Sequence, residues 1–222
     1  MAGRRASWWS RAWTRAIEEC VYEQRDLTHG RRIARQGLVG GIRVVPGRAM
    51  AAVEDPRGPF AVTIEVPALD AVAQEALVEV LAAQAGRLVA LLAGDLPHDL
   101  VEAIEEVGVE LLPYGGELTA SCSCEPWVDP CRHAVAVLTR LGTMLDADPL
   151  VLLALRGLRR EDLLARVHAA AGPDEPTDAG ATLEEVDDVD LAYDAVVRAV
   201  RLLHLLEAGE RDETDPDLTH LL

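Results

Sequence analysis

The first fifth of the chain has the hydrophobic pattern of two short helices. Residues 8 to 22 place apolar side chains three or four positions apart, which predicts an amphipathic helix with Trp9, Trp13, Ile17 and Cys20 on one face. Tryptophans in such a helix can stack on bases, but they more often anchor it to a core, and we favour the core. A second helix is predicted from an N-cap at Thr28 to Arg35, ended by Gly37.

Three strand-like segments follow and predict an antiparallel meander. GLVGGIRVV, AMAAVE and FAVTIEV are separated by the turns Pro46-Gly47 and DPRG. The last segment alternates apolar and other side chains, as a half-buried strand does. So small a sheet needs a helix over one face, and the apolar residues of 69 to 92 predict that cover. A further short helix is predicted from Asp95 and Pro97 to Gly108.

The stretch VELLPYGGELTASCSC contains two strand-like pieces around the turn residues 113 to 116, which predicts a β-hairpin. From Pro130 the pattern becomes helical, and two more helices are predicted, one opened by Asp148 and Pro149 and one in RREDLLARVHAA.

A polar linker, GPDEPTDAG, interrupts the pattern after residue 171. Beyond it, apolar residues from 186 to 203 step by three and four, which is the seam of a helix that docks on another helix. Because further leucines broaden this stripe, docking on the protein's own body is favoured over a free coiled coil. The acidic last dozen residues are expected to fray.

Charge is distributed unevenly along the chain. The net charge is −17, yet residues 1 to 48 carry +6, residues 49 to 170 carry −11 and residues 171 to 222 carry −12. All 21 basic residues are arginine, so any phosphate contact would be made by guanidinium groups. A genome rich in GC is the simpler explanation of that bias. No apolar run is long enough for a membrane span, and the N-terminus does not resemble a secretory signal, so we expect a cytoplasmic protein.

The strongest chemical signal is CSCEPWVDPCRH, residues 122 to 133. It contains three of the four cysteines, Cys122, Cys124 and Cys131, together with His133. Three sulfurs and one imidazole match tetrahedral zinc, and the site is predicted at a junction of loop and helix, where the helix N-terminus favours thiolates. Trp127 is expected to shield the site, and Arg132 to serve partly as a counter-charge.

Three other interpretations compete with structural zinc. The cysteines could be ordinary small buried residues, although four potential ligands at this spacing argue against it. A C-x-C redox pair would leave Cys131 and His133 unexplained. A catalytic zinc keeps one position open for water, whereas four protein ligands fill this site. Since no P-loop, G-x-S-x-G or G-x-G-x-x-G pattern occurs either, we expect no enzyme and no small-molecule substrate.

The arrangement C-x-C, six residues, C-x-H resembles the SWIM zinc finger, in the form found in bacterial SWIM proteins. The resemblance extends loosely over residues 7 to 170, and Glu125-Pro126 departs from it because family members often have Pro followed by an acidic residue. It implies a β-hairpin and a helix around one zinc. It also implies roles in DNA binding and protein–protein interaction, often with helicase-like ATPases.

The predicted fold class is therefore α+β: an antiparallel meander packed with helices, a SWIM-type zinc hairpin plus helix, and a C-terminal helical segment. The predicted divisions are 1–108, 109–171 for the finger with its following helices, 172–182 for the linker, and 183–222 for the acidic helix and tail.

Two functions follow from the sequence. A zinc-stabilised adaptor would recruit a protein such as a helicase-like ATPase, the partner that the family resemblance implies. Alternatively, the finger and the arginine-rich N-terminal segment would bind DNA directly, with phosphate contacts from Arg31, Arg32, Arg35 and Arg132. A sequence pI near 4.7 is far from that of a typical DNA-binding protein, so charge favours the adaptor.

Overall fold

The computed structural model describes residues 6–170 of the 222-residue chain. The predicted linker 172–182 and the acidic segment 183–222, with its apolar seam, lie outside the described residues. The described residues belong to one compact unit. The predicted division at residue 108 stays a prediction.

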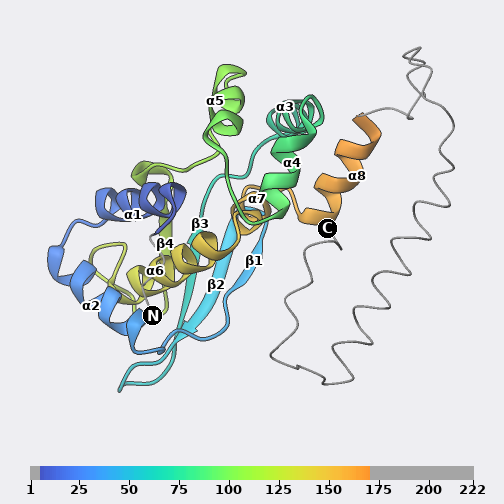
Figure 1. Ribbon diagram of the computed structural model, residues 1–222. Helices are drawn as coiled ribbons and strands as arrows, with labels where there is room; N and C mark the ends of the chain where they lie inside the picture. Colours follow the sequence, from blue (N-terminus) through green and yellow to red (C-terminus); the bar gives the residue numbers. More distant parts are fainter. Residues whose placement is uncertain (1–5, 171–222) are drawn as a thin grey trace, which may run out of the picture. The chain divides into compact units, whose positions relative to one another are not determined.

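A four-stranded antiparallel sheet forms the centre of the unit and has the strand order β1-β2-β3-β4 (Figure 1). The strands are β1 (Arg43–Val45), β2 (Arg48–Val53), β3 (Phe60–Glu65) and β4 (Thr119–Cys122). The first three are the predicted meander, joined by the two predicted turns. Val62 and Ile64 of β3 are buried, as the alternation predicted. With helices packed around this sheet, the α+β fold class is confirmed.

The pairing of β4 differs from the prediction. Residues 109–112 form no strand, so β4 has no hairpin partner beside it in the sequence. It pairs instead with β3, and Cys122 lies opposite Val62. The strand that ends in a cysteine thus extends the meander. The first strand is also shorter than predicted, because Val39 makes only an isolated bridge, to Val53.

Eight α-helices and one 3-10 turn surround the sheet in the described part of the chain. They are α1 (Trp8–Cys20), α2 (Gln24–Arg35), α3 (Ala71–Ala82), α4 (Ala85–Leu92), α5 (His98–Glu106), η1 (Gly115–Glu117), α6 (Arg132–Ala147), α7 (Leu150–Leu155) and α8 (Arg160–Ala170).

Two helices differ from their predicted limits. α2 begins at Gln24, so Thr28 is not an N-cap; its hydroxyl donates to the carbonyl of Gln24 inside the helix. The predicted helix over residues 69–92 is broken into α3 and α4. The guanidinium of Arg87 donates to the carbonyl of Val80 across the break, which replaces one of the hydrogen bonds that the end of α3 lacks.

The helix that covers the sheet is α6, the helix that begins in the cysteine stretch. It packs on β2, β3 and β4, whereas α3, the predicted cover, packs mainly on α4, α5 and α8 (Figure 1). The other side of α6 receives α1 and α2. α6 is therefore the central helix of the core, and nine of its sixteen residues are buried.

The tryptophans of α1 anchor this helix to α6, as predicted. Trp9 and Trp13 are 4% and 1% exposed, and their indole N–H groups donate to the carbonyls of Leu145 and Leu138 at 2.8 and 3.0 Å. A buried indole whose N–H is paired stabilises a core without leaving a polar group unsatisfied. These side chains are not available to stack on bases.

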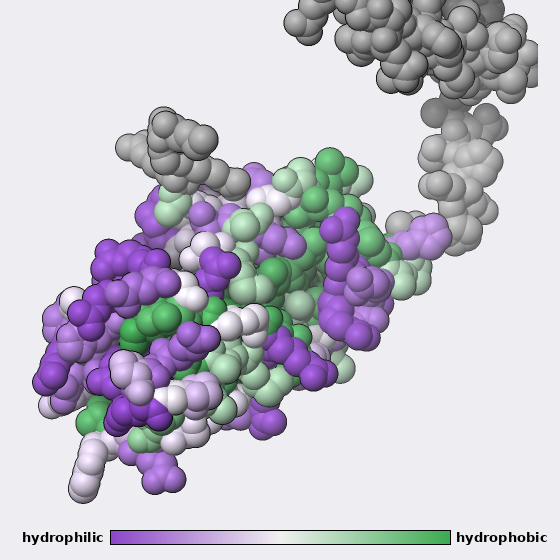
Figure 2. All heavy atoms as spheres, turned by 90° about the horizontal axis from the view of Figure 1, so that it is seen from below, coloured by the Kyte–Doolittle hydropathy of each residue, from purple (hydrophilic) through white to green (hydrophobic). Residues whose placement is uncertain are grey.

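Hydrophilic side chains dominate the surface at the end of the molecule that holds α1 and α2, whereas hydrophobic ones gather toward the opposite end (Figures 1 and 2). Over residues 6–170, no helix is both long and apolar enough to cross a bilayer.

Candidate metal centre

The four predicted ligands come from three consecutive pieces of local structure. Cys122 ends β4, and Cys124 lies in the turn that follows, which is closed by a hydrogen bond from the N–H of Glu125 to the carbonyl of Cys122. The strand thus ends two residues earlier than an extended C-x-C segment would require. Cys131 is the N-cap residue of α6, and His133 lies in the first turn of that helix. The predicted junction of loop and helix is confirmed.

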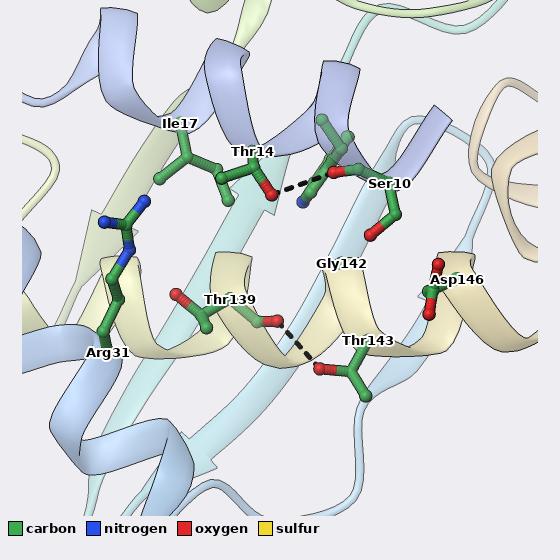
Figure 3. Close-up of a pocket in the computed structure, with 9 residues that line it drawn as sticks. Ser10, Thr14, Ile17, Arg31, Thr139, Gly142, Thr143 and Asp146 are labelled. Carbon is green, nitrogen blue, oxygen red and sulfur yellow. Dashed lines mark hydrogen bonds between the residues drawn. The ribbon is translucent and has the colours of Figure 1, made fainter. Parts of the chain in front are cut away.

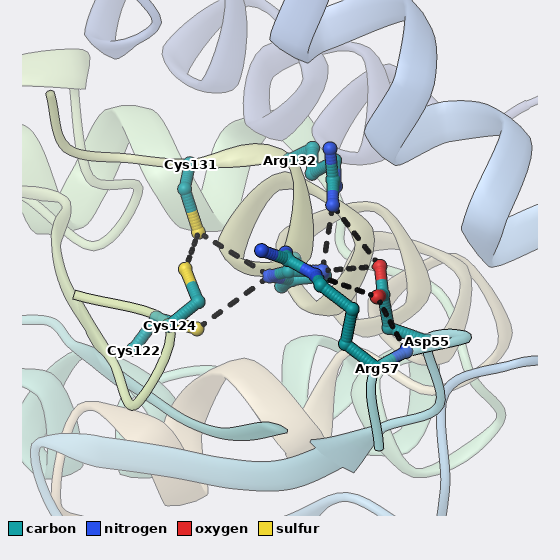
Figure 4. Close-up of polar contacts among 7 residues, drawn as sticks. Asp55, Arg57, Cys122, Cys124, Cys131 and Arg132 are labelled. Atoms are coloured by element: carbon teal, nitrogen blue, oxygen red, sulfur yellow. Dashed lines mark hydrogen bonds and ion pairs between the residues drawn. The ribbon is translucent and has the colours of Figure 1, made fainter. Parts of the chain in front are cut away.

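The side chains of these four residues converge on one point. One ligand atom from each lies within 4.8 Å of the others. The sulfurs of Cys124 and Cys131 are 3.6 Å apart, and Nδ1 of His133 lies 3.7 Å from Sγ of Cys122 and 3.9 Å from Sγ of Cys131 (Figure 4). Bonds of about 2.3 Å to sulfur place the corners of a tetrahedron about 3.8 Å apart, so the set fits zinc.

The ligand chemistry agrees with a structural zinc. Burial raises the pKa of the Cys122 thiol and the pKa of the Cys124 thiol. A divalent cation would offset this cost by binding the thiolate forms. All four positions of a tetrahedral ion would be filled by protein atoms, which is the structural rather than the catalytic arrangement. The site is suited to one structural zinc ion.

A carboxylate that the sequence interpretation missed lies next to the ligands. Oδ2 of Asp55, in the turn between β2 and β3, lies 3.1 Å from Nε2 of His133 (Figure 4). The hydrogen bond to His133, followed by the one from the backbone N–H of Arg57, lowers the pKa of Asp55 well below its usual range. The turn DPRG was recognised only as a turn, because nothing local indicates a contact across 78 residues.

The four arginines predicted to contact DNA differ in their surroundings. Arg31 pairs with Glu18 at 2.6 Å, and Arg132 pairs with Asp55 at 3.1 Å, so the charge of each is offset. Arg32 and Arg35 are exposed on α2, and neither has an acidic partner within ion-pair distance among residues 6–170. Arg132 also places Nε 3.4 Å from His133, consistent with its predicted role beside the ligands.

Trp127 does not shield the metal centre. Its side chain is fully exposed, with a relative exposure of 103%, and Val128 beside it is 38% exposed. The ring that does cover the site belongs to Phe60 of β3, whose centroid stacks 4.7 Å from that of His133 at an angle of 25°. Trp127 therefore projects from the loop between the second and third ligands.

A pocket lies between α1 and α6, with Arg31 of α2 in its lining (Figure 3). Its polar groups are largely used within the protein: the hydroxyls of Thr14 and Thr143 donate to carbonyls one turn earlier in their own helices. Arg31, at one end, is paired with Glu18, and Asp146, at the other, accepts from Ser7. The pocket thus presents no cluster of free reactive groups.

Comparison with known proteins agrees with the geometry. Residues 105–142 match the SWIM zinc finger family. The chain is also similar to the uncharacterized protein Rv2102 of Mycobacterium tuberculosis (strain ATCC 25618 / H37Rv), with 34% identity over 166 residues. The alignment covers 74% of this chain and 60% of that relative, so the chain spans less than two thirds of the relative's length. No solved structure matches the chain.

The matched segment begins near the end of α5 and includes β4, all four ligands and two thirds of α6. The spacing of the ligands, their convergence and the family match therefore agree, and the chain contains a SWIM zinc finger.

Proposed function

We propose that the protein is a non-catalytic adaptor that uses its zinc-stabilised loop, residues 125–129, to bind another protein. The observation that carries the proposal is the full exposure of Trp127 in this loop. A large exposed aromatic side chain on a loop fixed at both ends is the usual form of a binding anchor, because little conformational entropy is lost when it enters a pocket.

The chemistry of the loop indicates what kind of partner would fit. Val128 adds apolar surface, while Glu125 and Asp129 are exposed on either side of the aromatic residue. An apolar pocket with a basic rim would complement this loop. A helicase-like ATPase, which the family resemblance implies as a partner, is the first candidate to test for such a pocket. The same two acids oppose contact of the loop with phosphate groups.

The experiment compares Trp127→Ala with Tyr22→Ala, because Tyr22 is also an exposed aromatic residue (86%) but lies between α1 and α2. The zinc-loaded wild-type protein would first be used to capture partners from an extract of the cells that produce it naturally. Each captured protein would then be identified and purified, and its direct binding to the wild type and to both variants would be measured. The proposal predicts at least about a tenfold loss of affinity for the tryptophan variant, as for a binding hot spot, and an unchanged affinity for the tyrosine variant. Equal affinities for both variants would refute it.

Direct DNA binding is the second candidate, and the exposure of Arg32 and Arg35 on α2 favours it. This helix packs on α6, so both arginines belong to the part of the molecule that carries the finger. If they contact phosphates, binding to labelled single- or double-stranded DNA would weaken steeply with salt and would be lost in the double alanine variant. Absence of DNA binding even at low salt would rule out this second candidate and leave the adaptor as the remaining proposal.

A further inference from the structure

We propose that Asp55 is a positioning residue of the metal centre, which accepts the Nε2–H of His133 and thereby directs Nδ1 of the ring toward the three cysteines. This role goes beyond the four ligands of the finger and is independent of the proposed partner. It would make the turn between β2 and β3 a part of the metal centre.

The proton assignment follows from the neighbours of each ring nitrogen. Nδ1 faces the sulfurs of Cys122 and Cys131, so as a metal ligand it must present its lone pair there. A neutral imidazole then carries its one proton on Nε2. The two groups near Nε2 are Oδ2 of Asp55 at 3.1 Å and Nε of Arg132 at 3.4 Å. Because a guanidinium has only donors, the carboxylate must be the acceptor.

The carboxylate is itself held in place. Its Oδ1 accepts from the backbone N–H and the Nε of Arg57, both at 3.1 Å, and its Oδ2 accepts from Arg132 at 3.1 Å. The N–H of Gly58 closes the turn on the carbonyl of Asp55 at 2.8 Å. The side chain of Asp55 is only 9% exposed. An acceptor that is fixed and largely excluded from water orients its partner better than a mobile surface carboxylate.

The same hairpin fixes the plane of the ring. Phe60, the first residue of β3, stacks on His133, and the guanidinium of Arg57 lies 5.1 Å from the centroid of the phenyl ring on Phe60. Stacking fixes the plane of the imidazole, and the hydrogen bond to Asp55 determines which nitrogen faces the cysteines. The ring itself is 1% exposed, so it has no water to replace these contacts.

The charges around the ligands also favour this arrangement. Zinc with three thiolates and a neutral imidazole carries a net charge of about −1. The Asp55 carboxylate adds a second negative charge. The guanidinium groups of Arg57 and Arg132, which both pair with Asp55, offset these two negative charges. A carboxylate behind a ligating histidine raises the basicity of the ring and strengthens metal binding.

The test is zinc affinity, measured by competition with a chromophoric chelator. Asp55→Ala is expected to bind zinc about 10- to 100-fold more weakly than wild type. Asp55→Asn, whose amide oxygen can still accept the hydrogen bond, should lie between them. Glu54→Ala is the matched control, since Glu54 is the preceding residue and is exposed; it should bind as wild type does. Stability of the metal-free forms is measured alongside, because equal stabilities of Asp55→Ala and Glu54→Ala without metal show that a loss of zinc affinity does not come from a destabilised fold.

A measurement on the wild type keeps the test valid if Asp55→Ala does not fold. Long-range nitrogen–proton spectra of the zinc-loaded protein identify the protonated nitrogen of His133. A proton on Nε2 with Nδ1 bound to metal supports the proposal. Metal bound through Nε2, or an affinity of the alanine variant equal to that of the control, would overturn it.

Discussion

Ser123 and Ala61 are joined by two hydrogen bonds: the N–H of Ala61 donates to the Ser123 hydroxyl at 2.9 Å, and the N–H of Ser123 donates to the carbonyl of Ala61 at 2.9 Å. Ser123 lies between the first two metal ligands, and Ala61 belongs to β3. The turn that presents the cysteines is thereby attached to the edge of the meander. The metal centre is built partly on the sheet and is not a separate hairpin.

We therefore expect Ser123→Ala to lower the free energy of unfolding of the zinc-loaded protein by about 1 kcal/mol, because the backbone N–H of Ala61 loses its acceptor. Denaturant unfolding measures the change. Ser121→Ala is the control, since Ser121 is exposed on β4 and no side-chain hydrogen bond of Ser121 is found within residues 6–170. Equal changes for the two variants would show that the contact with Ala61 contributes nothing.

The packing of α2 on α6 should depend on Gly30. A Cβ atom at this position would lie 2.5 Å from Cβ of Val135 and 2.7 Å from the carbonyl oxygen of Arg132. Gly30→Ala is expected to destabilise the protein by about 1–3 kcal/mol through overpacking, although alanine is the better helix former. The measurement is the midpoint and slope of denaturant unfolding.

Gly86→Ala is the matched control for that variant. Gly86 is also in a helix, α4, but a Cβ there would meet no atom within 4 Å. Alanine should therefore stabilise the protein by about 0.5–1 kcal/mol. If Gly30→Ala stabilised the protein to the same extent, this result would contradict the close approach of α2 and α6 at Gly30.

Removal of zinc should unfold the region around the ligands and spare the rest. Without metal, the loop from Cys122 to His133 loses its cross-link, and the turn at Asp55 loses the oriented ring that it contacts. Hydrogen exchange after chelation is expected to increase in residues 54–61 and 119–133. It should stay unchanged in α3 to α5, because α3 packs on α4, α5 and α8 and not on the ligand loop. Loss of all helical signal in circular dichroism would contradict this expectation.

Zinc affinity should fall as pH is lowered. Burial raises the pKa of Cys122 and Cys124 in the metal-free protein, so both thiols are protonated near neutral pH, and zinc must displace their protons. Binding through three thiolates releases up to three protons, so affinity is expected to fall by as much as about 1,000-fold for each unit that the pH is lowered. Chelator competition at pH 6, 7 and 8 measures the slope, and a pH-independent affinity would show that the thiols do not ligate the metal.

Local patterns in the sequence were sufficient for the metal ligands and for much of the helical core. The ligands lie within twelve residues, so their spacing alone indicated a tetrahedral set. The helical period of Trp9 and Trp13 predicted the anchoring of α1, which the structure confirms. The first inference depends on residues that are close in the sequence, and the second on which face of a single helix is apolar.

Long-range pairing was not predictable in the same way. The segment that ends at Cys122 was predicted to pair within a local hairpin, yet its strand, β4, pairs with β3. The helix that covers the sheet is α6, whereas α3 was predicted to do so. Asp55 was hidden in a polar turn whose composition is that of any surface loop. Such contacts depend on which apolar faces the whole chain can bury together, and a single sequence does not contain that information.

The most direct test of the account is the zinc content of the purified protein and of two cysteine variants, measured by elemental analysis with native mass spectrometry. One zinc per chain is expected in the wild type and in Cys20→Ser, because Cys20 packs beside the core and is not one of the four converging residues. Cys124→Ser should lose zinc. A wild type without stoichiometric zinc, or a Cys124→Ser variant that retains it as firmly as Cys20→Ser, would contradict the structural zinc centre.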